Sequence, residues 1–439
     1  MARKALILVI ALILLSPLIY YATGIGQRAE GLSKSLVVLA DNTVRSSPKA
    51  VARHSLTLPL RIEHLLIYPL FLFLLQYSGL AVGLRTWLAE RVIQPLEAAP
   101  LFERLDRWLS GFTRGRLSLA QVLEIALYIT LVTLFITILF LPLSFYQGFV
   151  LAHQFGLSTQ TFLGWLRDFL VGQVVGLVIT LGVFGGFYAA LKLMPRRWPF
   201  WFGAGYAALT FGYILLEPLV ITPLFYTVTP VTDEALLSRI YALSDRAGMT
   251  VDDIFTVDAS SKTTAVNAYV TGFGGASKIG LWDTLLSTHP PDEVDVVLAH
   301  EMGHWYYRHV LIFALVYVLA AWVGFFLLRV WLGWVWQRLG WRGPDDVAGY
   351  PYLLALLALV SLLTLPPANG LSRFAENQAD QFALEVARKP AASIDLFHRL
   401  AEENLAVIDV PAWEKFLFYT HPPIRERLER AQQALEQSP

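Results

Sequence analysis

The sequence contains one short pattern whose residue types and spacing suit metal-dependent hydrolysis. His300 and His304 lie four positions apart, and Glu301 directly follows the first of them. On a helix, residues four apart lie on one face, so the two imidazoles can bind one ion. Glu301 then lies beside them as a base that can take a proton from an attacking water. The pattern therefore predicts a catalytic site with one Zn²⁺ per chain.

A catalytic zinc needs a third protein ligand, and this chain must supply it without cysteine. Glu376 is the candidate for that ligand. Asp380, one helical turn further on the same face, is placed to accept the free N–H of a ligating histidine and so to fix its tautomer. The alternative for both carboxylates is an ordinary solvated helix face.

The composition indicates that much of the chain lies in lipid. Apolar residues make up 56% and charged residues 15%, with a mean hydropathy of +0.53, whereas soluble domains carry about a quarter charged residues. A helix needs about 20 apolar residues to cross the hydrocarbon core. Seven uncharged stretches are candidate spans: 5–27, 65–84, 125–149, 169–191, 198–216, 310–328 and 347–372. We therefore expect an all-α integral membrane protein.

The first of these stretches has a second interpretation. Arg3 and Lys4 precede it, which is also typical of a signal peptide. The stretch is long and no small-residue cleavage site clearly follows it, so we expect a retained helix.

The order of the spans predicts how the site is assembled. We expect four parts: 1–226 with membrane helices one to five, a metalloprotease insertion at 227–309, helices six and seven at 310–372, and the rest of the metalloprotease domain at 373–439. Seven spans place the insertion and the tail on the same side of the membrane. The zinc helix is expected to run straight into the sixth span, and the seventh to end just before Glu376. Cleavage should then occur at the membrane boundary, on a membrane-associated substrate.

The charged residues give little information about the binding partners of the protein or about its orientation in the membrane. The formal net charge is zero, so nothing indicates nucleic-acid binding. Lys and Arg are equally numerous in the segments 28–64 and 85–116, which lie on opposite sides of the membrane, so they do not decide which side is cytoplasmic.

Several further blocks follow one another along the chain in the order seen in a known family. These blocks are residues 155–160, 221–225, 229–230, 267–269, 278–286, 298–305, 376–380 and 421–422. In these blocks and in its seven spans, the chain resembles the type I CAAX prenyl endopeptidases, zinc proteases that trim prenylated C-terminal tails. The resemblance covers most of the chain. It implies a barrel of seven membrane helices that encloses a chamber, with a mainly helical metalloprotease domain that carries a small β-sheet.

The resemblance also implies roles that the residues alone do not. Asn267, Ala268 and Tyr269 would form an edge strand that pairs with the extended substrate backbone, and Asn267 could also donate to the developing oxyanion. His421 would stabilise the tetrahedral intermediate or hold the substrate, and Arg427 lies where the family places a basic, substrate-binding residue. Without the resemblance, the Asn267 segment is an ordinary polar strand and His421 a turn histidine.

We therefore expect a membrane-embedded zinc endopeptidase that cleaves near the C-terminus of membrane-associated substrates, with or without a prenyl group. One alternative is a quality-control metalloprotease of the HtpX type that needs no prenyl group. Another is a transporter or scaffold with a vestigial zinc site. The expected location is a bacterial plasma (inner) membrane, or the endoplasmic reticulum in a eukaryote, with the catalytic face in the cytoplasm.

Overall fold

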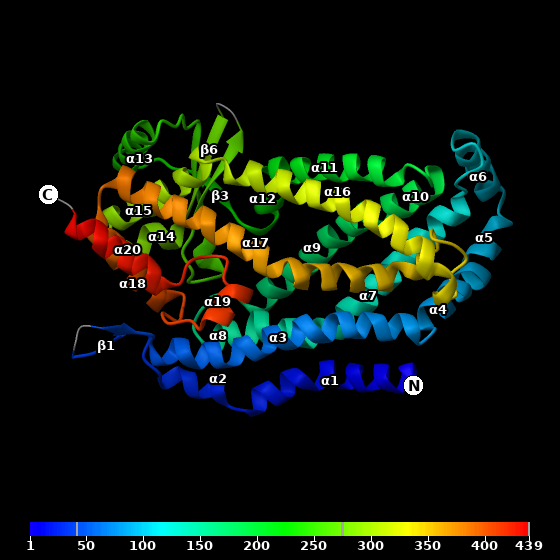
Figure 1. The fold of residues 1–439 in the computed structure, drawn as a ribbon, viewed down its shortest axis with the longest axis horizontal. Coiled ribbons are helices and arrows are strands. Elements are labelled where there is room, and N and C mark those ends of the chain that lie inside the picture. The colour runs from blue at the N-terminus through cyan, green and yellow to red at the C-terminus, as the bar shows by residue number, and fades with distance from the viewer. Residues whose placement is uncertain (41–42, 274–275, 438–439) are drawn as a thin grey trace.

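Long helices that run side by side dominate the structure, and a smaller mixed domain lies at one end of them (Figure 1). The computed structural model describes residues 1–40, 43–273 and 276–437. Within these described residues, seven helical stretches are long and apolar enough to cross a membrane: Ala2–Gly31, Pro48–Tyr77, Leu119–Gln154, Phe162–Leu193, Trp198–Phe225, His309–Leu339 and Val347–Ala387. The predicted all-α membrane fold with seven spans is confirmed.

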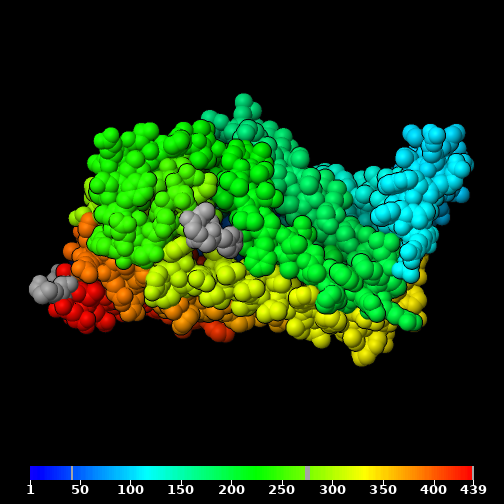
Figure 2. All heavy atoms as spheres, turned by 90° about the horizontal axis from the view of Figure 1, so that it is seen from above, coloured from blue at the N-terminus to red at the C-terminus, as the bar shows by residue number. Residues whose placement is uncertain are grey.

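These stretches contain the longest helices of the fold. They are α1 (Ala2–Ala22), α3 (Pro48–Tyr77), α7 (Leu119–Phe145), α9 (Phe162–Thr180), α11 (Trp198–Leu216), α16 (His309–Val335) and α17 (Tyr350–Ala387). Shorter helices continue or connect them: α2 (Ile25–Arg28), α4 (Leu80–Leu88), α5 (Gln94–Glu97), α6 (Pro100–Phe112), α8 (Ala152–Gln154), α10 (Gly186–Leu193) and α12 (Thr222–Phe225). The segment around α6 projects from the end of the bundle opposite the mixed domain (Figure 2).

The second span lies earlier in the chain than the sequence predicts. We expected 65–84, but α3 begins at Pro48, after the capping residue Ser47, and ends at Tyr77. The Ser47 hydroxyl accepts a hydrogen bond from the backbone of Ala50, and proline suits the first helical position. The error arises because the first half of α3 carries charged residues. Several of these face an internal cavity, which a hydropathy pattern cannot distinguish from water.

The catalytic segment does not run straight into the membrane as expected. Helix α15 (Pro291–Tyr306) contains the histidine pattern and ends before Arg308, which has a left-handed backbone with φ of 55°. Helix α16 then begins at His309 as a separate element. Helix α17 continues without a break from the predicted seventh span through Glu376 and Asp380 to Ala387.

A small sheet supports one side of α15. Its strands are β3 (Val228–Pro230), β4 (Asp253–Val257), β5 (Ala268–Phe273) and β6 (Ala276–Trp282), in the order β3-β4-β6-β5. Strands β4 and β6 are parallel, and the other two pairs are antiparallel. Strand β5 is therefore an edge strand, and its backbone can accept another strand. A separate two-stranded ribbon joins β1 (Val37–Val38) to β2 (Val44–Arg45).

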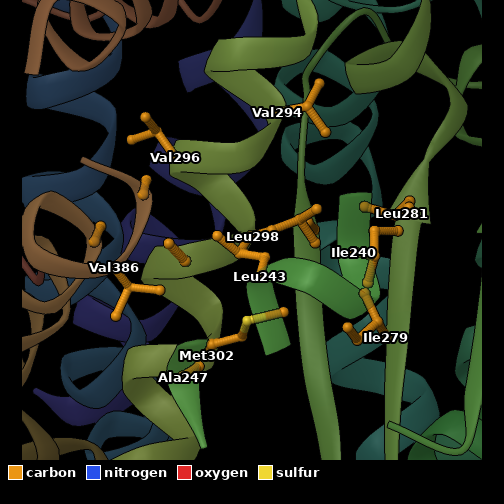
Figure 3. Packing of buried hydrophobic residues seen from close by; sticks show 14 of the residues in the cluster. Ile240, Leu243, Ala247, Ile279, Leu281, Val294, Val296, Leu298, Met302 and Val386 are labelled. Carbon is orange, nitrogen blue, oxygen red and sulfur yellow. The ribbon is translucent and has the colours of Figure 1, made fainter. Parts of the chain in front are cut away.

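The core of the mixed domain fixes α15 between the sheet and two helices (Figure 3). Leu298 and Met302 of α15 are fully buried, and they belong to one cluster with Leu243 of α13 (Glu234–Ala247) and Ile279 of β6. On another side, Gly303 faces α17 so closely that an added Cβ would lie 3.0 Å from the Ala379 Cα. These contacts hold the histidine pattern against the end of α17.

The remaining helices complete the mixed domain beside α17. They are α14 (Asp283–Thr288), α18 (Pro390–Glu403), α19 (Ala412–Phe418) and α20 (Ile424–Glu436). The loops after α1 contact this C-terminal part: the Leu36 N–H donates to the Glu402 carboxylate at 2.8 Å, and Arg425 donates to the Val44 carbonyl at 2.9 Å. The segment between α1 and α3 is thereby attached to the C-terminal part of the mixed domain.

Candidate metal centre and active site

Three predicted ligands from two helices meet at one point. The Nε2 atoms of His300 and His304, both on α15, lie 3.2 Å apart. The Glu376 carboxylate of α17 lies 3.3 Å from the first of these nitrogens and 3.4 Å from the second. The three side chains form a group that could hold a metal ion.

The geometry of this group fits zinc. Tetrahedral Zn²⁺ with ligand bonds of about 2.0–2.1 Å requires ligand atoms about 3.3 Å from one another. The distance between the two nitrogens is close to this value, and so is the distance from each nitrogen to one oxygen of the Glu376 carboxylate. In addition, Glu376 Oε2 is buried and accepts no hydrogen bond from the described residues. A buried carboxylate oxygen in that position is satisfied if a cation lies between it and the two imidazoles.

Asp380 contacts His300 at the ring nitrogen that is not directed at the predicted metal. Its Oδ1 lies 3.0 Å from His300 Nδ1. Burial lowers the pKa of His300, but contacts with Asp380 and Glu376 outweigh burial and raise it to about 10. The two carboxylates therefore stabilise positive charge at this position, as a metal site requires.

Arg427 and Arg430 of α20 hold Asp380 in turn. Arg427 binds both carboxylate oxygens, at 2.6 and 3.0 Å, and Arg430 adds a third contact at 3.0 Å. The predicted substrate-binding residue Arg427 thus has a partner inside the site. Its contact with a substrate stays a prediction.

The second histidine ligand is oriented by a residue that the sequence did not reveal. His304 Nδ1 lies 3.0 Å from His309 Nδ1, and His309 Nε2 lies 3.1 Å from Gln378 Oε1. If the Gln378 oxygen accepts from His309 Nε2–H, then His309 Nδ1 accepts from His304 Nδ1–H, which leaves the His304 Nε2 lone pair directed at the site. Burial, followed by the charge of His300, lowers the pKa of His304 to about 4, which also favours the neutral ring.

Glu301 lines a cavity of about 640 Å³ beside the ligands, together with His300, His421 and Arg427. Burial is the main cause that raises the pKa of Glu301, and Glu376 adds to it, whereas His300 and Arg427 lower the pKa; the result is about 7. A carboxylate with a pKa near neutrality can both take and return a proton.

His421 lies in the turn between α19 and α20, and its Nε2 is 3.3 Å from Glu376 Oε2. The Thr420 hydroxyl lies 2.9 Å from His421 Nδ1. If that hydroxyl donates to Nδ1, Nε2 carries the hydrogen and is a donor beside the metal ligands. Burial lowers the pKa of His421, so the neutral ring is favoured.

The three residues of the predicted edge strand, Asn267 to Tyr269, differ in how much of each side chain is accessible from the cavity. Asn267 is exposed and lines the cavity just before β5. Its Oδ1 accepts from the Ala268 N–H at 3.0 Å, which leaves its NH₂ as a donor. Ala268 is buried, and the Tyr269 ring packs against Gly280 and Phe255. Ala268 and Tyr269 therefore offer a substrate only their backbone.

A second cavity of about 650 Å³ lies next to the first and extends among the membrane helices. Both cavities are lined by Arg53, Thr57, Arg61 and Asn404. Apolar side chains of α3 and of the segment after α7 form much of the second wall: Leu60, Leu65, Leu151, Phe155 and Leu157. The catalytic cavity thus continues into an internal chamber.

Comparison with known proteins agrees with this architecture. Residues 230–435 match the model of peptidase family M48, and residues 96–227 match the model described as CAAX prenyl protease N-terminal, five membrane helices. The crystal structure of S. mikatae Ste24p has the same fold, with a TM-score of 0.70 at 20% identity, over 97% of this chain and 98% of that one. Fold, ligand group and family models together define a membrane metallopeptidase.

Sequence relatives narrow the class to one family. The chain is 30% identical to the uncharacterized metalloprotease YhfN of Bacillus subtilis, over 75% of this chain and 77% of that protein. It is 31% identical to the CAAX prenyl protease 1 homolog of Oryza sativa subsp. japonica, over 67% and 70%. It is 30% identical to CAAX prenyl protease 1 of Saccharomyces cerevisiae, over 66% and 68%. The chain belongs to the CAAX prenyl protease 1 family of membrane metalloproteases.

This membership confirms the resemblance and the predicted metalloprotease activity. It favours the CAAX type over the quality-control alternative. It also implies a bound metal, for which the group of His300, His304 and Glu376 is the candidate site.

Proposed function

We propose that the protein is a zinc-dependent endopeptidase that cleaves membrane-associated substrates near their C-terminus. One observation carries this proposal. The Nε2 atoms of His300 and His304 lie 3.2 Å apart, and the two carboxylate oxygens of Glu376 lie 3.3 Å from the first nitrogen and 3.4 Å from the second. This group lies beside Glu301, next to a cavity that borders a second one among the membrane helices. His300, His304 and Glu376 would hold the ion, and Asp380 would hold His300.

The bound zinc would act as a Lewis acid that polarises the scissile carbonyl and makes water more acidic. Glu301 takes the proton of the attacking water and later gives it to the leaving amine. The developing oxyanion receives hydrogen bonds from His421 Nε2–H and from the amide NH₂ of Asn267. The edge of β5 aligns the substrate by backbone hydrogen bonds, and Arg427 keeps Asp380 in place while it lines the substrate cavity.

The substrate class follows from the chamber and from the relatives. Its apolar wall suits a lipid chain attached to the peptide, and several relatives carry the name CAAX prenyl protease 1. We therefore expect a prenylated C-terminal tail to be a better substrate than the bare peptide. The catalytic face would be cytoplasmic, in a bacterial plasma membrane or in the endoplasmic reticulum of a eukaryote.

The test is Glu301→Gln in the purified full chain, assayed with a farnesylated peptide and its bare counterpart. The variant should bind one zinc per chain, as the wild type does, while peptide cleavage falls by about 10²–10⁴-fold, because it lacks only the base. Glu376→Gln should instead lower zinc content. Glu385→Gln, an exposed position further along α17, is the matched control and should change neither.

Normal turnover in Glu301→Gln would contradict the mechanism. Equal cleavage of the farnesylated and bare peptides by the wild type would leave the endopeptidase in place but remove the preference for a prenyl chain.

A further inference from the structure

The wall shared by the two cavities carries two arginines from one face of α3. Arg53 and Arg61 lie eight positions apart with Thr57 midway, so all three fall on one side of the helix. Each of the three lines both the catalytic cavity and the chamber. Both arginines thus lie where the catalytic cavity meets the cavity among the membrane helices.

Neither arginine has a carboxylate partner among the residues that the structure describes. Arg53 Nη1 donates to the Asn404 carbonyl at 3.3 Å, and the Arg61 guanidinium lies 4.8 Å from the centre of the Phe418 ring. The other arginines of the cavity differ, because Arg427 and Arg430 both bind Asp380. Charged side chains within membrane spans usually pair with one another or serve a ligand.

Glu414, an acidic residue of the same cavity wall, does not form an ion pair with either arginine. Glu414 is buried, and its carboxylate is 3.2 Å from His54 Nε2. The two arginines thus line the shared wall, and no carboxylate of the described residues forms an ion pair with either of them. Such a pair is suited to a carboxylate, which arginine binds through two parallel hydrogen bonds.

The sheet indicates which substrate carboxylate would reach them. Strand β5 begins at Ala268, directly after Asn267, and the residues just before that point, Ala265 and Thr263, line the chamber with Arg53 and Arg61. A substrate strand antiparallel to β5 runs from Phe273 toward Ala268. Its C-terminal end therefore continues past Asn267 toward the two arginines, whereas a parallel strand would bring its amino end there.

We propose that Arg53 and Arg61 bind the free C-terminal carboxylate of the substrate, with the peptide antiparallel to β5. This inference rests on the proposed endopeptidase function and deepens it. The two arginines would make the enzyme select peptides whose chain ends shortly after the scissile bond. Thr57, between them, can donate a further hydrogen bond.

The test compares two peptides that differ only at the last residue, one with a free carboxylate and one with a carboxamide. The wild type should cleave the acid with a kcat/KM about 10- to 100-fold higher than the amide, the range expected for hydrogen bonds to a charged group. Arg53→Gln and Arg61→Gln should lower this ratio toward one by slowing only the acid. Arg53→Lys should restore part of it, and Arg104→Gln on α6 should change nothing.

Binding to the Glu301→Gln variant separates this inference from the proposed function, because it requires no cleavage. That variant should bind the acid more tightly than the amide, and Arg53→Gln added to it should reduce the difference by weakening binding of the acid only. Equal affinity for both peptides, or an equal loss for both on Arg53→Gln, would overturn the inference even if Glu301 proves essential. Unchanged zinc content and melting temperature show that the arginine variants are folded.

Discussion

Two residues outside the histidine pattern, His309 and Gln378, orient the ring of His304, the predicted second metal ligand. His304 depends on His309, and His309 depends on Gln378. Replacing His309 by Phe removes the acceptor for His304 Nδ1–H, so zinc affinity should fall by about 10- to 100-fold, as is typical when the partner of a metal-binding histidine is lost. Chelator competition on the purified protein measures this.

Tyr306→Phe, at the exposed end of α15, is the control and should leave the affinity unchanged. Wild-type affinity in the His309→Phe variant would show that His304 is held by α15 alone.

The pH profile should follow Glu301, because the base must be ionised to accept a proton. Burial is the main cause that raises its pKa, His300 and Arg427 lower the pKa, and the result is about 7. A bound dication would lower it further. kcat/KM should therefore fall as the pH is lowered through the pKa of Glu301. Arg427→Gln removes one of the opposing charges, so the acid limb should move to higher pH.

Arg430→Gln also removes a partner of Asp380, but Arg430 does not contribute to the Glu301 shift. The acid limb of the kcat/KM pH profile of Arg430→Gln should therefore lie at the same pH as that of the wild type. An equal movement in both variants would assign the effect to Asp380 instead.

Among single residues, the sequence identifies those whose spacing alone is informative. His300 and His304 are one turn apart, and so are Glu376 and Asp380, and each pair does share a helix face. His309, Gln378 and Arg430 were missed because their contacts arise where α16, α17 and α20 pack together. The resemblance assigned Arg427 to the substrate, whereas its partner Asp380 is visible only in the fold.

Between elements, the close approach of α15 to α17 sets the ligand geometry. Alanine at Gly303 would place its Cβ 3.0 Å from the Ala379 Cα and 3.2 Å from the Phe382 Cβ. The helices must then separate, so Gly303→Ala should destabilise the protein by about 1–3 kcal/mol and weaken zinc binding, because Glu376 moves with α17. Melting temperature and zinc affinity report the two effects.

Gly212→Ala on α11 is the matched control, since nothing lies within 4 Å of its added Cβ. Wild-type zinc affinity in Gly303→Ala would mean that the ligands do not depend on this helix contact.

Two elements show where sequence patterns stop being informative. The sequence predicts a later start for α3 because charged residues such as Arg53 and Arg61 are typical of loops, although here they lie on a long helix and line a cavity. The break at Arg308 was missed because a left-handed backbone at a non-glycine residue has no sequence signal. Both features depend on what packs around the helix.

For the whole molecule, the seven spans fix which segments share a side. The segments after α1 and before α15 should lie on the catalytic side, and the end of α16 on the other. The chain has no cysteine, so Ser35→Cys, Ser287→Cys and Gln337→Cys each introduce a unique thiol. A membrane-impermeant maleimide should label Ser35→Cys and Ser287→Cys from one face of vesicles, and Gln337→Cys from the other.

The cysteine-free parent is the control and should remain unlabelled. Labelling of Ser35→Cys and Gln337→Cys from the same face would contradict the seven-span order, and vesicles of known orientation identify the cytoplasmic face.

The unbroken course of α17 has a consequence for the modularity of the enzyme. Its 38 residues begin in the membrane bundle and end with Glu376, Asp380 and two further turns, so the boundary that the sequence indicated at 372–373 falls inside a continuous helix. Cutting there would separate Glu376, the proposed third ligand, from the part of α17 that lies in the membrane bundle. The metalloprotease domain therefore cannot be released from the membrane as a separate soluble domain, because one continuous helix belongs both to the membrane bundle and to the catalytic site.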